Sequence, residues 1–90
     1  MKRVRAIVSG RVQGVWYRAH TREMATELGV AGFVRNLPDG TVEIVAQGDD
    51  AQVDALMDWA RVGPSMAEVV EVRVREMVED EDYSSFEVLH

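Results

Sequence analysis

The residues best suited to chemistry in this 90-residue chain lie between Gly10 and Arg18. Gly10 and Gly14 let the chain turn tightly and let a ligand approach the backbone closely. Arg18 stands where a helix is expected to begin, and its planar guanidinium can donate two parallel hydrogen bonds to phosphate oxygens. Because free N–H groups and the helix dipole attract anions to a helix N-terminus, the loop has the parts of a phosphate site. The same residues also fit an ordinary strand-to-helix connection with Arg18 on the surface.

Hydrophobic periodicity predicts the elements that position this loop. Apolar residues alternate with polar ones at 2–9, and they recur at helical spacing at 19–28, before a capping glycine, Gly29. Asp49 and Gln52 form the pattern of a capping box at the start of a second helix, which a Gly-Pro pair ends. Further predictions are strands at 30–36, 41–47 and 69–75, a turn at 37–40, a short edge strand within 84–89, and a solvated acidic loop at 79–82.

The order strand, helix, strand, strand, helix, strand is typical of the ferredoxin-like split β-α-β fold, an α+β class. We expect an antiparallel sheet with two helices on one face. The first and second strands run parallel in this fold, with the third strand between them. Their C-terminal ends therefore lie at the same edge of the sheet, where the loop that ends at Arg18 can meet Asn36, eighteen residues further on.

Length and composition predict one domain over residues 1–90 and narrow the function classes. Without cysteine, the chain has no disulfide, thiolate nucleophile or cysteine-based metal site. Its net charge of −6 argues against general nucleic-acid binding. Residues 1–40 include seven basic and three acidic residues, whereas residues 41–90 include three basic and thirteen acidic residues. The basic first part of the chain could therefore attract a small anion locally. The sequence has no signal peptide or membrane span, which fits the cytoplasm.

Three stretches of the chain resemble signatures of the acylphosphatase family. The first, at 9–18, reads SGRVQGVWYR, and the second, at 32–43, reads GFVRNLPDGTVE. A weaker third stretch at 63–69 reads GPSMAEV. The resemblance covers nearly the whole chain, in the family's order and at its length. The departures are Tyr17, where the family often has phenylalanine, and a Val-Leu-His ending where many members close with arginine and tyrosine.

The resemblance implies an enzyme that hydrolyses acyl phosphates to a carboxylate and inorganic phosphate. It assigns catalysis to Arg18, whose guanidinium would hold the phosphate, and to Asn36, whose amide would orient the attacking water. Thr41 is expected to help hold Asn36 or the water. The phosphate would also receive backbone N–H groups from the loop formed by Gln13, Gly14, Val15, Trp16, Tyr17 and Arg18.

The implied reaction needs neither a metal nor another cofactor. Phosphoryl transfer passes through a loose transition state and a carboxylate leaves readily, so positioning and fixed dipoles suffice without a covalent intermediate. The expected partner is a small acyl phosphate, with inorganic phosphate as product and competitive inhibitor. We expect a monomer that binds neither nucleic acid nor membrane.

Two other functions remain open. By the same resemblance, this domain begins larger hydrogenase-maturation proteins that handle carbamoyl phosphate, although a length of 90 residues favours a separate hydrolase. Ferredoxin-like sheets also serve as regulatory or RNA-binding modules, and RNA binding needs exposed aromatic residues on a basic face. Phe33 is the only clear strand aromatic before Phe86, which disfavours that function.

Several residues near the predicted site have ordinary structural explanations. His20 is expected on the surface of the first helix, with no catalytic role. Asp39 fits a hairpin turn, where Asp-Gly is a favoured pair. Trp16 and Tyr17 either line the acyl side of the pocket or pack in the core, and the sequence favours neither alternative.

Overall fold

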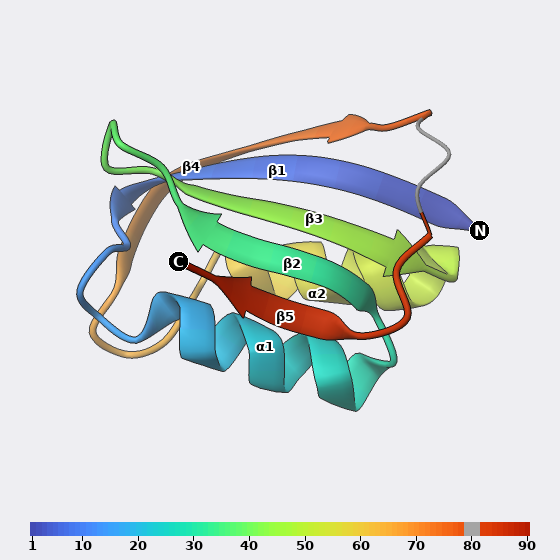
Figure 1. Cartoon of the computed structure of the whole chain (residues 1–90). Coiled ribbons are helices and arrows are strands. Elements are labelled where there is room, and N and C mark those ends of the chain that lie inside the picture. Colours follow the sequence, from blue (N-terminus) through green and yellow to red (C-terminus); the bar gives the residue numbers. More distant parts are fainter. Residues whose placement is uncertain (79–81) are drawn as a thin grey trace.

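The computed structural model of the chain describes residues 1–78 and 82–90. Its elements in chain order are β1 (Lys2–Arg11), α1 (Tyr17–Leu28), β2 (Ala31–Asn36), β3 (Val42–Gly48), α2 (Asp50–Ala60), β4 (Glu68–Glu76) and β5 (Phe86–Leu89). Figure 1 shows one sheet with both helices against the same face. The acidic loop predicted at 79–82 lies outside the described residues except for Asp82, which is exposed. No helix in the described ranges has the length and hydropathy needed to cross a membrane.

The strand order β4-β1-β3-β2-β5 confirms the predicted ferredoxin-like topology and adds a parallel edge. β1 and β2 both pair antiparallel with β3, so they run parallel to each other and end at the same edge of the sheet. β5 pairs parallel with β2, which makes the sheet mixed rather than wholly antiparallel. β5 lies at the edge of the sheet opposite β4 and runs in the direction of β2, whereas β4 runs antiparallel to β1 (Figure 1).

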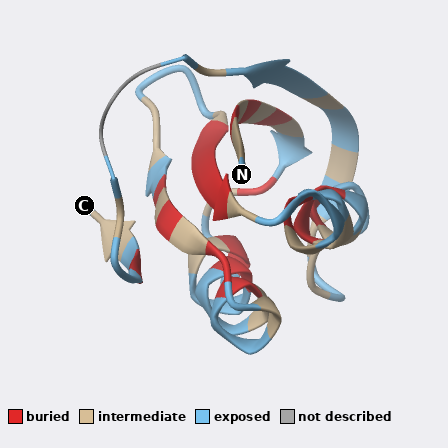
Figure 2. Cartoon of the chain, turned by 90° about the vertical axis from the view of Figure 1, so that its right-hand side faces the viewer, coloured by how far each residue is buried: buried red, intermediate tan, exposed pale blue. Residues whose placement is uncertain are grey.

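The core lies between the sheet and the two helices, as the buried residues in Figure 2 show. Alternate residues of β1 are buried and pair with alternate residues of β3. Both helices turn their apolar sides to this surface. The buried side chains include Val4, Ala6, Val8, Ala25, Val42, Ile44, Ala46, Val53, Leu56, Met57 and Ala60.

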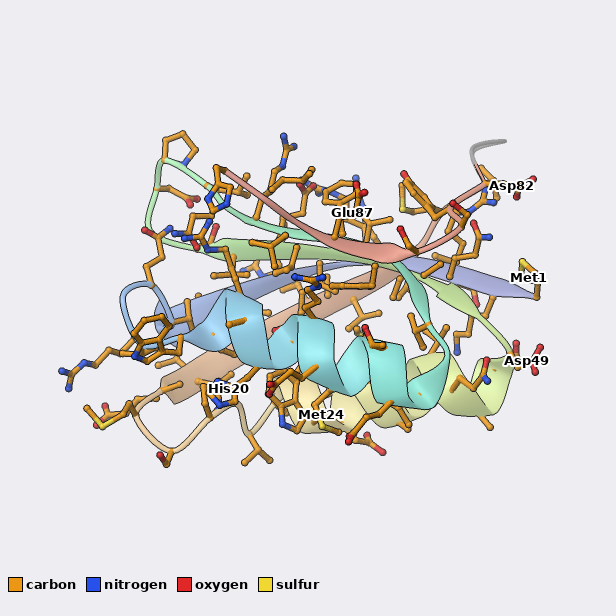
Figure 3. All side chains as sticks on the ribbon, turned by 60° about the horizontal axis from the view of Figure 1, so that its bottom comes forward. Met1, His20, Met24, Asp49, Asp82 and Glu87 are labelled. Atoms are coloured by element: carbon orange, nitrogen blue, oxygen red, sulfur yellow. The ribbon has the colours of Figure 1, made fainter. Side chains whose placement is uncertain are left out.

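The predicted end of β1 and the predicted start of α1 each differ from the structure by two residues. β1 continues to Arg11 instead of ending at residue 9, because its pairing with β4 resumes at Gly10 after a register shift. α1 begins at Tyr17, two residues before the predicted start. The predicted capping box is present at the start of α2, where Figure 3 labels Asp49. The Asp49 N–H donates to Gln52 Oε1 at 3.1 Å.

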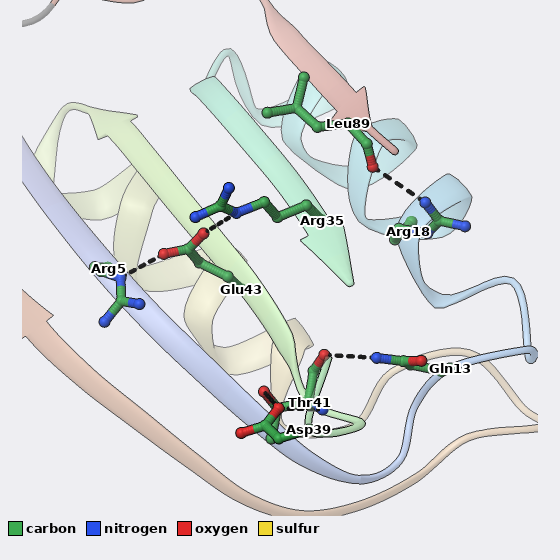
Figure 4. Close-up of polar contacts among 8 residues, drawn as sticks. All are labelled: Arg5, Gln13, Arg18, Arg35, Asp39, Thr41, Glu43 and Leu89. Carbon is green, nitrogen blue, oxygen red and sulfur yellow. Dashed lines mark hydrogen bonds and ion pairs between the residues drawn. The ribbon is translucent and has the colours of Figure 1, made fainter. Parts of the chain in front are cut away.

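The sheet face opposite the helices carries a buried carboxylate between two arginines. Arg5 and Arg35 each donate through Nε to the carboxylate of Glu43, whose side chain is only 4% exposed (Figure 4). Burial by itself raises the pKa of Glu43, but the hydrogen bonds and charges of the two guanidinium groups outweigh it and hold that pKa below its ordinary value. The three residues join β1, β3 and β2 across this face.

Candidate active site

The connection between β1 and α1 turns through two left-handed residues. Gly14 has a φ of 76°, and Trp16 has a φ of 66° and a ψ of 18°. α1 then begins at Tyr17 with no side chain capping its first N–H groups and no acidic residue in its first turn. Because the first N–H groups of a helix lack intrahelical partners, this end of α1 presents donors and a positive dipole to an anion.

The side chain of Gln13 ties this loop to the hairpin between β2 and β3. Its Nε2 donates to the carbonyl oxygen of Leu37 at 2.9 Å. It also donates to the carbonyl oxygen of Thr41 at 2.9 Å (Figure 4). Within the hairpin turn, Asp39 Oδ1 accepts from the Thr41 hydroxyl at 2.6 Å and from the Thr41 N–H at 3.0 Å. Those hydrogen bonds lower the pKa of Asp39, as expected for a carboxylate stabilised by local donors. The turn that follows Asn36 is thereby fixed relative to the loop.

The guanidinium of Arg18 lies at the point where the loop, α1 and β5 meet. Its Nη1 donates to the carbonyl oxygen of Leu89 at 3.1 Å (Figure 4), and it lies 3.3 Å from Nδ1 of His90. Both contacts come from the C-terminal end of β5, which reaches this edge because it runs parallel to β2. One guanidinium nitrogen is thus held by the protein, while arginine has further N–H donors for a ligand.

Asn36 is the last residue of β2 and shares a pocket with Arg18. It pairs with buried Val42, so its side chain is on the sheet face that the helices cover. Its Oδ1 is buried and has no hydrogen-bond partner among the residues that the structure describes. The pocket has a volume of about 330 Å³. Its lining residues are Val12, Gly14, Trp16, Tyr17, Arg18, Ala19, Asn36, Val88 and His90.

Comparison with known proteins identifies the family. The model of the acylphosphatase family matches residues 4–88, which is nearly the whole chain. The chain belongs to the acylphosphatase family. Acylphosphatases hydrolyse acyl phosphates, so the protein is an enzyme of this class and its substrates are small acyl phosphates.

Relatives of nearly equal length support this membership. An acylphosphatase of Methylococcus capsulatus is 56% identical over 89 residues, which cover 99% of this chain and 97% of the relative. The crystal structure of acylphosphatase from Bacillus subtilis has a TM-score of 0.95 at 32% identity and covers 100% of both chains. The structure of an acylphosphatase from Coxiella burnetii has a TM-score of 0.93 at 42% identity, covering 98% of this chain and 92% of that one.

The acylphosphatase fold brings together most of the residues that the sequence predicted. Arg18 and Asn36 line one pocket with Gly14, Trp16 and Tyr17. The other three predicted residues are not among its lining residues: Val15 is buried, Gln13 reaches the hairpin, and the Thr41 hydroxyl bonds to Asp39. The expected support of Asn36 by Thr41 stays a prediction.

Trp16 and Tyr17 have different environments in the structure. Tyr17 is buried, its hydroxyl donates to the Ala60 carbonyl at 2.7 Å, and its ring lies 5.5 Å from that of Trp59. Burial raises the pKa of the Tyr17 phenol. Trp16, in contrast, is 74% exposed. His20 is exposed on α1, as expected (Figure 3). Its Nδ1 lies 3.0 Å from the Trp16 carbonyl oxygen.

Sequence reasoning missed the contribution of β5 to the site. Val88 and His90 line the pocket, and the Leu89 carbonyl holds Arg18. A short edge strand was predicted there, but not its partner strand or its direction. Placing it parallel to β2 would have brought residues 88–90 to the edge that holds Asn36.

The described residues include no cluster suited to a metal ion. No group of three or more histidine, cysteine, aspartate or glutamate side chains comes together in the part of the chain that the structure describes. The charged group that faces the pocket is the guanidinium of Arg18, which suits an anion rather than a cation.

Proposed function

We propose that the pocket binds the phosphoryl group of an acyl phosphate against Arg18 and the N-terminus of α1, and that Asn36 orients the attacking water. The observation that carries this proposal is the meeting of Arg18 with a buried, unpartnered Asn36 Oδ1 in one pocket of the described structure. The guanidinium of Arg18 is a cationic donor for phosphate oxygens, and Asn36 Oδ1 is an acceptor for a water molecule.

The phosphate half of the pocket combines a charge with backbone donors. Arg18 can turn its remaining N–H groups to the phosphoryl oxygens while the Leu89 carbonyl holds Nη1. The loop from Gln13 to Arg18 would add backbone N–H groups, and the uncapped start of α1 adds a favourable dipole. Inorganic phosphate carries the same oxygens, so it would compete with the substrate.

The water half of the pocket depends on the Asn36 amide. A buried acceptor without a partner lowers stability by about 1–3 kcal/mol, so Oδ1 favours a bound water that donates to it. Such a water would be oriented with a lone pair toward the phosphorus. The position of Asn36 at the end of β2, next to the hairpin that Gln13 clamps, fixes where this water lies relative to the loop.

The chemistry then balances without a further reagent. The water oxygen forms a bond to phosphorus as the phosphorus–oxygen bond to the acyl group breaks, and the carboxylate leaves with the bonding electrons. One water proton passes to the phosphate product or to solvent. Because a carboxylate is a weak base and the transition state spreads charge over the phosphoryl oxygens, fixed donors can provide the catalysis.

The test is hydrolysis of benzoyl phosphate followed by ultraviolet absorbance, in the presence of EDTA. We expect EDTA-resistant turnover that inorganic phosphate inhibits competitively. Arg18→Ala should raise the barrier by at least about 2.7–4 kcal/mol, the cost of removing one preorganised donor. The matched control is Arg22→Ala, which removes an equal charge from an exposed residue of the same helix outside this pocket. Equal activity in the two variants would contradict the proposal.

A further inference from the structure

Trp16 is the one aromatic residue among the strongly exposed large apolar side chains of the described structure. The others in that set are Met1, Val62, Met66, Val70, Val74 and Val78. Trp16 is 74% exposed, yet it lines the same pocket as Arg18 and Asn36. A tryptophan left in water gives up the large hydrophobic stabilisation that its burial would bring. Packing within this chain therefore does not account for its position.

The backbone of Trp16 makes its placement more unusual. Its φ of 66° lies in the left-handed region, and no other non-glycine residue of the described ranges has a positive φ. Glycine adopts this region freely, whereas a bulky side chain there strains the backbone. The Trp16 carbonyl accepts from the His20 N–H at 3.1 Å and lies 3.0 Å from His20 Nδ1, which helps hold the conformation. Such strain beside a pocket points to a ligand-binding role.

The proposed function leaves the binding of the acyl group unassigned. Arg18 and the start of α1 would hold the phosphoryl group, and Asn36 the water, so the acyl group needs a wall of its own. Because the attacking and leaving oxygens lie roughly in line, the acyl group lies across the phosphorus from the water. Trp16 enters the pocket from the loop, whereas Asn36 enters it from β2. Tyr17 cannot supply that wall with its ring, which is buried against Trp59.

We propose that Trp16 forms the acyl-binding side of the pocket and gives the enzyme a preference for acyl phosphates with planar aromatic acyl groups. The inference rests on the proposed function, because it takes the phosphoryl position from Arg18. An indole face packs favourably against an aromatic ring, with an energy beyond that of the buried area alone. A small acyl group such as acetyl gains little of that contact.

The test compares benzoyl phosphate with acetyl phosphate in Trp16→Gly and Trp16→Phe. Glycine accepts the left-handed backbone, so Trp16→Gly removes the indole without adding strain. We expect the ratio of the KM for benzoyl phosphate to the KM for acetyl phosphate to rise on the order of tenfold in Trp16→Gly, and much less in Trp16→Phe, which keeps a ring. The matched control is Trp59→Phe, since Trp59 does not line this pocket, and it should keep the wild-type ratio. A wild-type ratio in Trp16→Gly would overturn the proposal.

A binding measurement gives a readout independent of turnover. The chain has two tryptophans, so Trp59→Phe leaves Trp16 as the only indole fluorophore. Phenacylphosphonate and acetonylphosphonate replace the bridging oxygen of benzoyl and acetyl phosphate by carbon and are not hydrolysed at that bond. We expect phenacylphosphonate to change the Trp16 emission at lower concentration than acetonylphosphonate, and equal affinities would overturn the proposal.

The two proposals fail in different ways. Full activity in Arg18→Ala would overturn the proposed function, and the acyl assignment with it. Loss of activity in Arg18→Ala together with an unchanged KM ratio in Trp16→Gly would overturn the acyl-binding role alone.

Discussion

At the scale of single residues, Glu43 shows how a buried charge is tolerated in this small protein. Its carboxylate is almost completely removed from solvent, and two arginines on neighbouring strands donate to it. Its pKa in the folded protein is below the ordinary value of 4.5, so the folded state favours the ionised form. The stabilisation is therefore present at pH values above 4.5 and is lost as the pH falls through the lowered folded-state pKa.

Glu43→Gln tests this linkage. We expect the variant to lose about 2 kcal/mol of unfolding free energy at pH 7, the value of hydrogen bonds to a charged group. The difference from wild type should shrink below pH 4.5, where the wild-type carboxylate also takes up a proton. Urea denaturation at several pH values measures it. Glu87→Gln is the control, because Glu87 is exposed and pairs in register with Phe33 on the same sheet face. A pH-independent difference for Glu43→Gln would refute the linkage.

Some of the residues that form the site could be predicted from the sequence. Arg18 and Asn36 carry the family signatures, and the fold places them in one pocket. The Leu89 carbonyl that holds Arg18 could not be predicted, because a backbone contact depends on which strand lies nearby and not on side-chain type. The different environments of Trp16 and Tyr17 could not be predicted either, since both are large aromatic residues. The structure leaves Trp16 exposed on a left-handed backbone and buries Tyr17.

At the scale of elements, the site depends on how the β1–α1 loop is fixed to the β2–β3 hairpin. Gln13 Nε2 donates the two hydrogen bonds that join them, and the carbonyl oxygens of Leu37 and Thr41 accept these bonds. The hairpin positions Asn36, and the loop positions Arg18. In the proposed function, these two hydrogen bonds would set the geometry between the phosphoryl group and the water, to which reaction rates are sensitive.

Gln13→Ala tests the clamp. Two hydrogen bonds are lost, so we expect the unfolding free energy to fall by about 1–3 kcal/mol and kcat to fall on the order of tenfold. The control is Gln52→Ala, which removes a glutamine side chain from the capping box of α2 and should lower stability while kcat stays near wild type. The two measurements are urea denaturation and benzoyl phosphate turnover. An unchanged kcat in Gln13→Ala would show that the clamp has no part in catalysis.

The order of the elements could be predicted from hydrophobic periodicity and helix caps, whereas the residues at which they end could not. The capping box at Asp49 and Gln52 is a local pattern, and it appears where the sequence predicts it. β1 runs past residue 9 because β4 continues to pair with it after the register shift at Gly10. That continuation is a tertiary effect, since neither segment alone specifies where pairing stops.

At the scale of the whole molecule, the parallel placement of β5 completes the site. The strand lies along the outer edge of β2 (Figure 1) and ends beside the pocket. Leu89 and His90 therefore contact Arg18. β5 is only four residues long, and its alternation is too short to specify a partner strand or a direction. The sequence therefore predicted the arrangement of the first four strands. It did not predict the parallel fifth strand that makes the sheet mixed.

Removal of Leu89 and His90 tests this contribution. The deletion takes away the carbonyl that accepts from Arg18, so we expect kcat/KM for benzoyl phosphate to fall by about tenfold or more. Leu89→Ala keeps that carbonyl and should lose less. Circular dichroism should show a retained fold, because the buried residues between the sheet and the helices are untouched. Wild-type kcat/KM in the folded deletion variant would show that Arg18 needs no support from β5.

Phosphate affinity and kcat, measured on the same variants, separate the proposed phosphate-binding role of Arg18 from the proposed water-orienting role of Asn36. Titration calorimetry with inorganic phosphate and turnover of benzoyl phosphate would be compared in Arg18→Ala and Asn36→Ala. We predict that Arg18→Ala weakens phosphate binding at least tenfold, because it removes the charge in the pocket. Asn36→Ala should keep phosphate affinity within about threefold and lose about 10²–10³ in kcat. Wild-type phosphate affinity in Arg18→Ala, or wild-type kcat in Asn36→Ala, would contradict the account.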